Sequence, residues 1–148
     1  MKLVPVVAVA LIGADGRVLM QRRRLSRAHG GLWEFPGGKV EGGESPEQAA
    51  VREMAEELAV VIAPAALIPV GFASDPAQPP APRQPHLILL YLCRQWDGDP
   101  QCLDAEAIAW VAPGALQDLT MPPLDYPLAA ALVRYCGADL QAAAAPRC

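Results

Sequence analysis

The segment 37–60 constrains the fold more than any other part of the sequence, because it fixes a loop, a helix start and a helix length. It opens with "GGKVEGGES", whose glycines and polar residues are typical of a loop. Ser45 then provides an N-cap, Pro46 suits the first helical position and Gln48 fits a capping box. The helix is predicted to end at about Ala59.

The predicted helix has an apolar side and an acidic side. Its apolar residues recur at helical spacing and predict a buried stripe; they are Val51, Met54, Ala55 and Leu58. Its acidic residues are predicted on the opposite side, near the small Ala49; they are Glu53, Glu56 and Glu57. Like charges three and four residues apart repel each other on a helix, and the helix dipole disfavours negative charge in the last turns.

Two interpretations of this acidic side are open. Charge runs on helices are usually solvated surface, which needs no ligand. A hard divalent cation would instead remove the repulsion, and Mg²⁺ is commonly held by carboxylates together with substrate phosphates. The adjacent glycines let the backbone approach a ligand closely. The acidic cluster beside the glycine loop therefore favours a site for a magnesium-bound polyphosphate.

The rest of the chain predicts mainly strands. Residues 3–12 form a β-rich run, and "VLMQRR" at 18–23 is predicted as the second arm of a hairpin after the "GADGR" turn. Residues 24–32 are predicted as loop. "WEFPGG" at 33–38 is predicted as a short strand that is stopped by Pro36 and two glycines. Later strands are expected at 66–74, 86–96 and 107–113.

The C-terminal half contains one proline-rich segment and one helical pattern. The five prolines of 75–85 exclude a helix and a central strand there, so an exposed loop is expected. Residues 124–136 carry an apolar helical pattern, and the tail at 138–148 either extends that helix or frays. Strands and helices in this order predict an α+β or mixed α/β sandwich, with residues 1–148 as one domain.

Composition excludes several classes of protein. The net charge of −4 gives no basic surface for a nucleic-acid duplex. The apolar run at 4–12 is too short to span a bilayer and lacks the features of a signal peptide. The cysteines have no CxxC spacing, so reduced thiols in a cytoplasmic protein are expected; they are Cys93, Cys102, Cys136 and Cys148.

The loop and the acidic helix together resemble the signature of the Nudix family, G-x5-E-x7-R-E-U-x-E-E-x-G-U, in which U is a bulky apolar residue. The signature spans 38–60 here. The matching residues are Gly38, Glu44, Arg52, Glu53, Met54, Glu56, Glu57 and Val60. Ala59 stands where the signature has glycine, which affects the turn out of the helix but removes no carboxylate.

This resemblance implies a fold, an activity and a cofactor. Nudix enzymes hydrolyse nucleoside diphosphates linked to another group, and their fold is an α/β/α sandwich around a mixed sheet with a loop–helix–loop signature. The implied metal ligands, for Mg²⁺ or Mn²⁺, are Glu53, Glu56, Glu57 and the carbonyl of Gly37. Arg52 is expected either to pair with Glu44 or a neighbouring carboxylate and orient the site, or to form an ordinary surface ion pair.

Further stretches resemble the MutT-like branch of the family, whose members hydrolyse 8-oxo-dGTP to clear oxidised guanine nucleotides from the nucleotide pool. "LWEFPGGKVE" leads into the signature, a pair of arginines lies at 22–23, and "WDGDP" and a later tryptophan follow at 96–100 and 110. "PPLDYP" at 122–127 matches the stretch that reads the purine, with Asp125 at the base-reading position. Asp125 either reads the base or caps the last helix.

The resemblance also implies substrate contacts, each with an alternative. Gly38 belongs to the loop on the substrate side, and Lys39 either meets a phosphate or is exposed. Arg23 either binds the α-phosphate and sugar region or is exposed. Phe35 either packs on the base or fills the core, and His29 either matches the branch's histidine or is a plain loop residue.

The proton acceptor of the reaction has several candidates. In the MutT-like pattern an extra glutamate follows the W-x-G-x-P stretch, and Asp104 aligns with it. Glu106 is the alternative, and a glutamate of the acidic helix must serve if neither of them reaches the metal.

The expected function is therefore a magnesium-dependent nucleoside triphosphate pyrophosphohydrolase with a small nucleotide as its partner, as a monomer or a homodimer. One alternative is a Nudix enzyme that hydrolyses another substrate such as ADP-ribose, and the loop at 75–85 is where such a change of substrate is expected to show. The other alternative is a nucleotide-binding module without turnover. The intact carboxylate cluster argues against the module.

Overall fold

A computed structural model describes residues 2–76, 80 and 84–144 of the chain. The main sheet has four strands in the order β4-β1-β6-β5. Its strands are β1 (Val4–Leu11), β4 (Gly37–Lys39), β5 (Ile68–Ser74) and β6 (His86–Cys93). β1 and β6 run parallel and the other neighbours run antiparallel, which confirms the expected mixed sheet.

A second sheet of three antiparallel strands has the order β3-β2-β7. Its strands are β2 (Val18–Arg22), β3 (Trp33–Glu34) and β7 (Ala107–Val111). The predicted hairpin of 3–12 and 18–23 is therefore wrong, since only one isolated bridge joins the two strands, between Ile12 and Val18. β1 pairs with β4 along one edge and with β6 along the other, so it offers β2 no free edge.

The glycines at 37 and 38 do not stop a strand as predicted. They form β4 and pair with Ala8 and Val7 of β1. A β-carbon at Gly37 would collide with the backbone of Val7, so this strand can approach β1 only as glycine. The glycine loop is thereby fixed to the sheet at the start of the signature segment.

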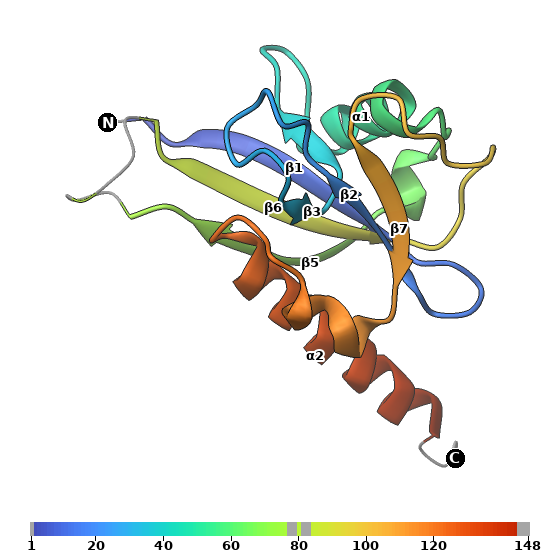
Figure 1. Ribbon diagram of the computed structural model, residues 1–148. Helices are drawn as coiled ribbons and strands as arrows, with labels where there is room; N and C mark the ends of the chain where they lie inside the picture. Colours follow the sequence, from blue (N-terminus) through green and yellow to red (C-terminus); the bar gives the residue numbers. More distant parts are fainter. Residues whose placement is uncertain (1, 77–79, 81–83, 145–148) are drawn as a thin grey trace.

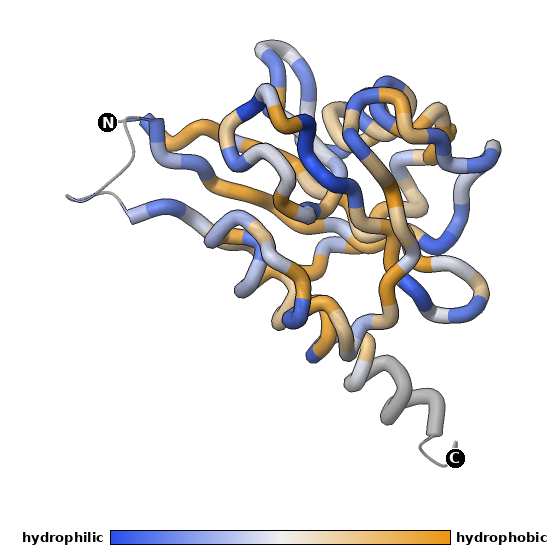
Figure 2. The backbone as a smooth tube through the Cα atoms, in the orientation of Figure 1, coloured by the Kyte–Doolittle hydropathy of each residue, from blue (hydrophilic) through white to orange (hydrophobic). Residues whose placement is uncertain are grey.

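The helices cover opposite faces of the main sheet, which confirms the expected α/β/α arrangement (Figure 1). α1 (Pro46–Leu58) packs on one core cluster with Val7, Val9 and Leu11, and α2 (Asp125–Ala144) packs on the other. Figure 2 shows that hydrophobic residues concentrate along the central strands between the helices. Short 3₁₀ helices, η1 (Pro64–Ala66) and η2 (Pro113–Asp118), complete the elements.

α1 begins and ends as predicted but is rotated relative to the predicted stripe. Ala55 is exposed and Val51 is only partly buried, whereas Ala49 is fully buried. Glu57, predicted on the acidic side, is 8% exposed. This rotation turns Glu57 toward the strands below, where Gln21 Nε2 and Gly37 N donate hydrogen bonds to its carboxylate.

The remaining expectations fall partly outside the described residues. The proline-rich loop at 75–85 includes 77–79 and 81–83, which are not described, and the tail continues α2 as far as Ala144. Cys93, Cys102 and Cys136 form no disulfide with one another, and Cys148 lies outside the described part. No helix within the described ranges is long and apolar enough to cross a membrane.

Candidate active site

The N-terminus of α1 is held by the predicted capping box. Ser45 Oγ accepts a hydrogen bond from Gln48 N at 3.1 Å, and Gln48 Oε1 accepts one from Ser45 N at 2.8 Å. At the other end, Ala59 adopts the left-handed conformation with φ 58° and ψ 33°, and its N–H donates back to Ala55 O. The alanine thus takes the conformation that favours the signature glycine.

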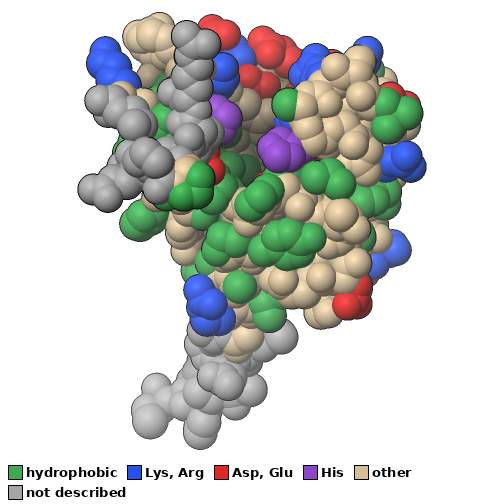
Figure 3. Space-filling view, turned by 60° about the vertical axis from the view of Figure 1, so that its left-hand side comes forward, with side chains coloured by type: hydrophobic (Ala, Val, Ile, Leu, Met, Phe, Trp, Pro, Cys, Tyr) green, Lys and Arg blue, Asp and Glu red, His purple; other side chains and the backbone are tan. Residues whose placement is uncertain are grey.

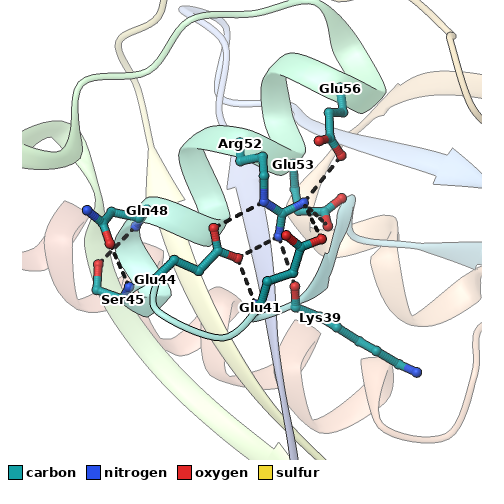
Figure 4. A network of polar contacts seen from close by, with 8 residues as sticks. All are labelled: Lys39, Glu41, Glu44, Ser45, Gln48, Arg52, Glu53 and Glu56. Carbon is teal, nitrogen blue, oxygen red and sulfur yellow. Dashed lines mark hydrogen bonds and ion pairs between the residues drawn. The ribbon is translucent and has the colours of Figure 1, made fainter.

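Arg52 is the centre of an ion-pair network on the outer side of α1 (Figure 4). Its guanidinium makes two hydrogen bonds to Glu44, of 2.6 and 3.1 Å, and one to Glu53 Oε1 of 2.9 Å. It also reaches Glu56 at 3.3 Å and the carbonyl oxygen of Lys39 at 3.0 Å. The predicted pairing of Arg52 with Glu44 is confirmed, and it ties the loop to the helix.

This network explains part of the carboxylate cluster without a metal ion. Hydrogen bonds from Arg52 hold the pKa of Glu44 below its usual value. Burial raises the pKa of Glu53, although its bond to Arg52 opposes that shift. Glu53 and Glu56 therefore tolerate each other because one guanidinium lies between them.

Glu57 lies on the inner side of α1 in a different environment. Its Oε2 accepts hydrogen bonds from Gly37 N at 3.0 Å and from Gln21 Nε2 at 3.2 Å, and both donors are uncharged. Burial, with the nearby charge of Glu53 as the second cause, raises the pKa of Glu57 to about 8. A buried carboxylate with neutral partners is poorly compensated, and a bound cation would supply the missing charge.

The glycine loop lies directly against these carboxylates. A β-carbon at Gly38 would collide with the carboxylate of Glu53, so the signature glycine is required for this approach. Among the described residues, however, no three His, Cys, Asp or Glu side chains are grouped so that they could hold a metal ion. Glu53 and Glu56 face Arg52 while Glu57 faces Gly37. The donor types suit a hard cation, and the carboxylates would have to move toward each other to bind it together.

A second buried acid lies at the start of α2. Asp125 is 6% exposed, and its Oδ2 accepts a hydrogen bond from Phe35 N at 3.1 Å. Burial raises the pKa of Asp125 to about 7. This side chain bonds across to the strand segment 33–35, so it does more than occupy the first turn of its helix. The ring of Phe35 is buried in the core, as the safer alternative predicted.

Arg23 and Glu34 form an ion pair of 3.0 Å next to Asp125, and Arg23 Nε also donates to Ala28 O at 2.7 Å. Burial raises the pKa of Glu34, and the charge of Arg23 opposes the shift. His29 has a positive φ of 57°, and the loop 24–32 closes on Arg23, whose N–H donates to Leu32 O and whose carbonyl oxygen accepts from Gly31 N. Figure 3 shows histidine and hydrophobic side chains around a hollow on this face of the molecule.

Among the described residues, Asp104 makes no hydrogen bond or ion pair with the carboxylates of α1, although the N–H of the neighbouring Leu103 donates to the carbonyl oxygen of Glu57 at 3.2 Å. Its Oδ1 pairs with Arg27 at 3.1 Å and with Arg24 at 3.6 Å. Glu106 accepts a hydrogen bond from Leu25 N at 3.3 Å. Both candidates for the proton acceptor therefore fasten the loop after β2 to the loop before β7. The side chain of Lys39 is exposed and points away from the Arg52 network (Figure 4).

The tryptophans of the MutT-like stretches have a packing role. Trp96 and Trp110 stack with their ring centroids 6.2 Å apart and their planes at 21°. Both rings pack on the core cluster under α1. These residues support the fold around α1, and none of the residues predicted to contact the substrate takes part in this stack.

Sequence reasoning missed Gln21 and Glu34. Gln21 is 4% exposed and bonds Glu57, a residue 36 positions away. Glu34 pairs with Arg23 next to Asp125, and the sequence pattern marks it only as part of the "EFPGG" stretch. A polar residue inside the otherwise apolar strand "VLMQ" was the available signal for Gln21.

Comparison with known proteins decides the family. The NUDIX domain matches residues 2–132, which is most of the chain. This chain belongs to the NUDIX family. The loop–helix–loop at 38–60 and the mixed sheet are therefore those of a Nudix hydrolase, a class of enzymes that act on phosphoanhydride bonds and generally use a divalent metal.

Two curated relatives from Escherichia coli (strain K12) cover nearly the whole Nudix domain. The chain is 35% identical to a CTP pyrophosphohydrolase over 129 residues, 86% of this chain and 90% of the relative. It is 31% identical to an 8-oxo-dGTP diphosphatase over 130 residues, 86% of this chain and 95% of the relative. The resemblance stated from the sequence is confirmed at the level of the family and the hydrolase class.

Solved structures agree with the fold. The E. coli ORF135 protein has a TM-score of 0.80 at 29% identity, covering 93% of this chain and 94% of that one. A MutT structure reported for Aliivibrio salmonicida and Vibrio cholerae has a TM-score of 0.76 at 27% identity, covering 90% and 99%. A Francisella tularensis neighbour at 24% identity, solved with AMP and a Mn ion, supports the fold alone.

Proposed function

We propose that this Nudix hydrolase is a magnesium-dependent nucleoside triphosphate pyrophosphohydrolase that releases pyrophosphate and a nucleoside monophosphate, with 8-oxo-dGTP or a related nucleotide as substrate. The observation that carries the proposal is the environment of Glu57, a buried carboxylate with only neutral donors beside Glu53 and the glycine strand. A cation between these groups and a polyphosphate would compensate both charges.

The residues that would hold the metal ion are Glu53, Glu56, Glu57 and the carbonyl of Gly37. A bound divalent ion neutralises phosphate charge and lowers the pKa of water. Arg52 would orient Glu53 and Glu56 through the ion pairs it makes in the structure. Gly38 leaves space for Glu53 next to the loop, and Lys39 is free to move toward a phosphate because its side chain is exposed.

A glutamate of α1 is the best candidate for the proton acceptor. The carboxylate of Asp104 is already paired with two arginines, Arg24 and Arg27. Glu53 is largely buried beside the glycine loop, and burial raises its pKa. We assign the proton to Glu53 and keep Asp104 as the residue that holds the loop of 24–27.

Nucleotide recognition is assigned to the group around Asp125. The backbone N–H of Phe35 holds Asp125 Oδ2, which leaves the other oxygen for a base edge. A carboxylate accepts hydrogen bonds from base N–H groups, whereas a carboxylic acid also donates one. Arg23 and His29 lie on the loop beside this acid and would contact the sugar and α-phosphate.

The proposal is tested by product formation, with magnesium, from 8-oxo-dGTP, dGTP, the other deoxynucleoside triphosphates, CTP and ADP-ribose. A clear preference for 8-oxo-dGTP supports it, and Asp125→Asn should then reduce that preference. Glu53→Gln should abolish turnover while the fold stays intact. A fully active Glu53→Gln enzyme would show that the metal-site assignment is wrong.

CTP is the second candidate, and the 35% identity to a CTP pyrophosphohydrolase is the observation that favours it. Cytosine offers an N4 donor to Asp125 without needing an oxidised purine edge. A preference for CTP over every purine nucleotide in the same panel would select this alternative. A preference for ADP-ribose would keep the Nudix chemistry and reject both triphosphate substrates.

A further inference from the structure

Gln21 is a buried amide that is neither a proposed metal ligand nor a proposed nucleotide contact. It lies in β2, is 4% exposed, and its Nε2 donates to Glu57 Oε2 at 3.2 Å. Its Oε1 is buried and has no hydrogen-bond partner among the described residues. Burying an unpaired amide oxygen is costly, so a contribution to stability does not account for this side chain.

The sheet register explains how Gln21 reaches the catalytic helix. Gln21 stands directly opposite Glu34 in the ladder between β2 and β3, so the two side chains lie on the same face. The amide of Gln21 is also close enough to Glu34 to oppose the rise in the pKa of that acid. It therefore lies between a carboxylate of the nucleotide side and a carboxylate of α1.

The two donors on Glu57 act on the same oxygen. Gly37 N and Gln21 Nε2 both bind Oε2, at 3.0 and 3.2 Å. The other oxygen, Oε1, takes no part in these two bonds. Because two N–H groups from different strands fix Oε2, the plane of the carboxylate is set and the direction of Oε1 is set with it.

We propose that Gln21 is a positioning residue of the metal site, which holds Glu57 from behind so that its second oxygen is directed to a divalent cation. The inference rests on the proposed function, since it requires Glu57 to bind that cation. Groups that hydrogen-bond a metal ligand typically change metal affinity by about 10–100-fold when they are replaced. The backbone N–H of Gly37 cannot be removed by mutation, so Gln21 is the one of these two donors that a substitution can remove.

The test replaces the amide by apolar side chains of similar size, Gln21→Met and Gln21→Leu, in the full chain. Mn²⁺ binding is measured by electron paramagnetic resonance and Mg²⁺ binding by competition with Mn²⁺. We expect both variants to bind the metal about tenfold or more weakly than the wild type. We expect their melting temperatures without metal to stay within about 3 °C of the wild type, because the amide leaves one polar atom unpaired.

A matched control is Gln48→Met, which removes a glutamine hydrogen bond at the other end of α1, to Ser45. It should leave metal affinity unchanged. A lower melting temperature in the Gln21 variants with wild-type metal affinity would overturn the inference and make the residue structural. Weakening in only one of the two variants would also overturn it, because shape rather than the lost donor would then be responsible.

Glu57→Gln separates this inference from the proposed function. If Glu57→Gln binds Mn²⁺ as tightly as the wild type, the metal site itself is wrong. If Glu57→Gln loses the ion and both Gln21 variants bind it like the wild type, only the role of Gln21 is wrong.

Discussion

The outer and inner sides of α1 both carry carboxylates, but their negative charges are balanced in opposite ways. On the outer side, Arg52 pairs with Glu44, Glu53 and Glu56, so positive charge is built into the protein. On the inner side, Glu57 has two neutral donors and its burial raises its pKa to about 8. The negative charges on the outer side are thus balanced by Arg52, whereas the partners of Glu57 on the inner side are uncharged and a bound cation would balance its charge. This difference distinguishes Arg52 and its partners, which orient the site, from Glu57, whose charge only a bound metal ion would balance.

The largest effect expected from this comparison is that of Glu57→Gln. The variant keeps the size and an acceptor for Gly37 N but loses the charge that would bind the metal. We expect kcat to fall by at least about 100-fold, because metal-ion stabilisation of phosphate charge supplies several kcal/mol. Steady-state product formation at saturating Mg²⁺ measures it.

The control is Glu47→Gln, which removes a charge from the same helix but keeps an acceptor for Tyr91 Oη. It should retain most of the activity. If Glu57→Gln and Glu47→Gln lose activity equally, the inner carboxylate has no special role and the distinction between the two sides fails.

The next effect is a pH dependence of stability that comes from Asp125. Burial raises its pKa to about 7 in the folded protein, from an ordinary 3.8 in the unfolded chain. The stabilisation from its bound proton is complete below the unfolded value and is lost as the pH rises toward about 7. The free energy of unfolding should therefore fall across this window by about 1.4 kcal/mol per pH unit from this group.

Asp125→Asn isolates the effect, because the amide cannot titrate but still accepts a hydrogen bond from Phe35 N. Urea unfolding of both proteins at about pH 5, 6, 7 and 8, without metal, should show the wild type losing stability relative to the variant until about pH 7. A stability difference that is independent of pH would mean that the carboxyl group is not buried as described.

A smaller effect is expected for Arg52→Lys on the outer side. Lysine keeps the charge but cannot reach Glu44, Glu53 and the Lys39 carbonyl together, as the guanidinium does. We expect kcat to fall about tenfold, because orientation of the carboxylates is worth about 1.4 kcal/mol here. Single-turnover measurements check this.

Arg17→Lys is the matched control, since Arg17 pairs with Asp15 at an exposed site remote in sequence from the signature. It should leave kcat unchanged. If Arg52→Lys also leaves kcat unchanged, the outer network is an ordinary surface cluster and does not orient the site.

The two sides of α1 also show what the sequence can and cannot predict. Ser45 and Gln48 act through neighbours three residues away, so the helix start was predictable from local chemistry. The inward-facing Glu57 accepts its hydrogen bonds from Gln21 and Gly37, which are 36 and 20 residues away, and no local pattern contains that information. The hairpin prediction failed for the same reason, because whether β1 has a free edge depends on strands elsewhere in the chain.

The smallest expected effect concerns Ala59, the departure from the Nudix signature. Its φ of 58° lies in the left-handed region, which costs a residue with a β-carbon about 1 kcal/mol relative to glycine. Ala59→Gly should therefore raise the free energy of unfolding by up to about 1 kcal/mol, and Ala63→Gly, at φ −74°, should lower it slightly through the flexibility of the unfolded chain. Urea unfolding of the two variants compares them directly. If Ala59→Gly is no more stable than the wild type, the helix end adapts to alanine without strain, and the signature glycine is then explained by something other than this backbone turn.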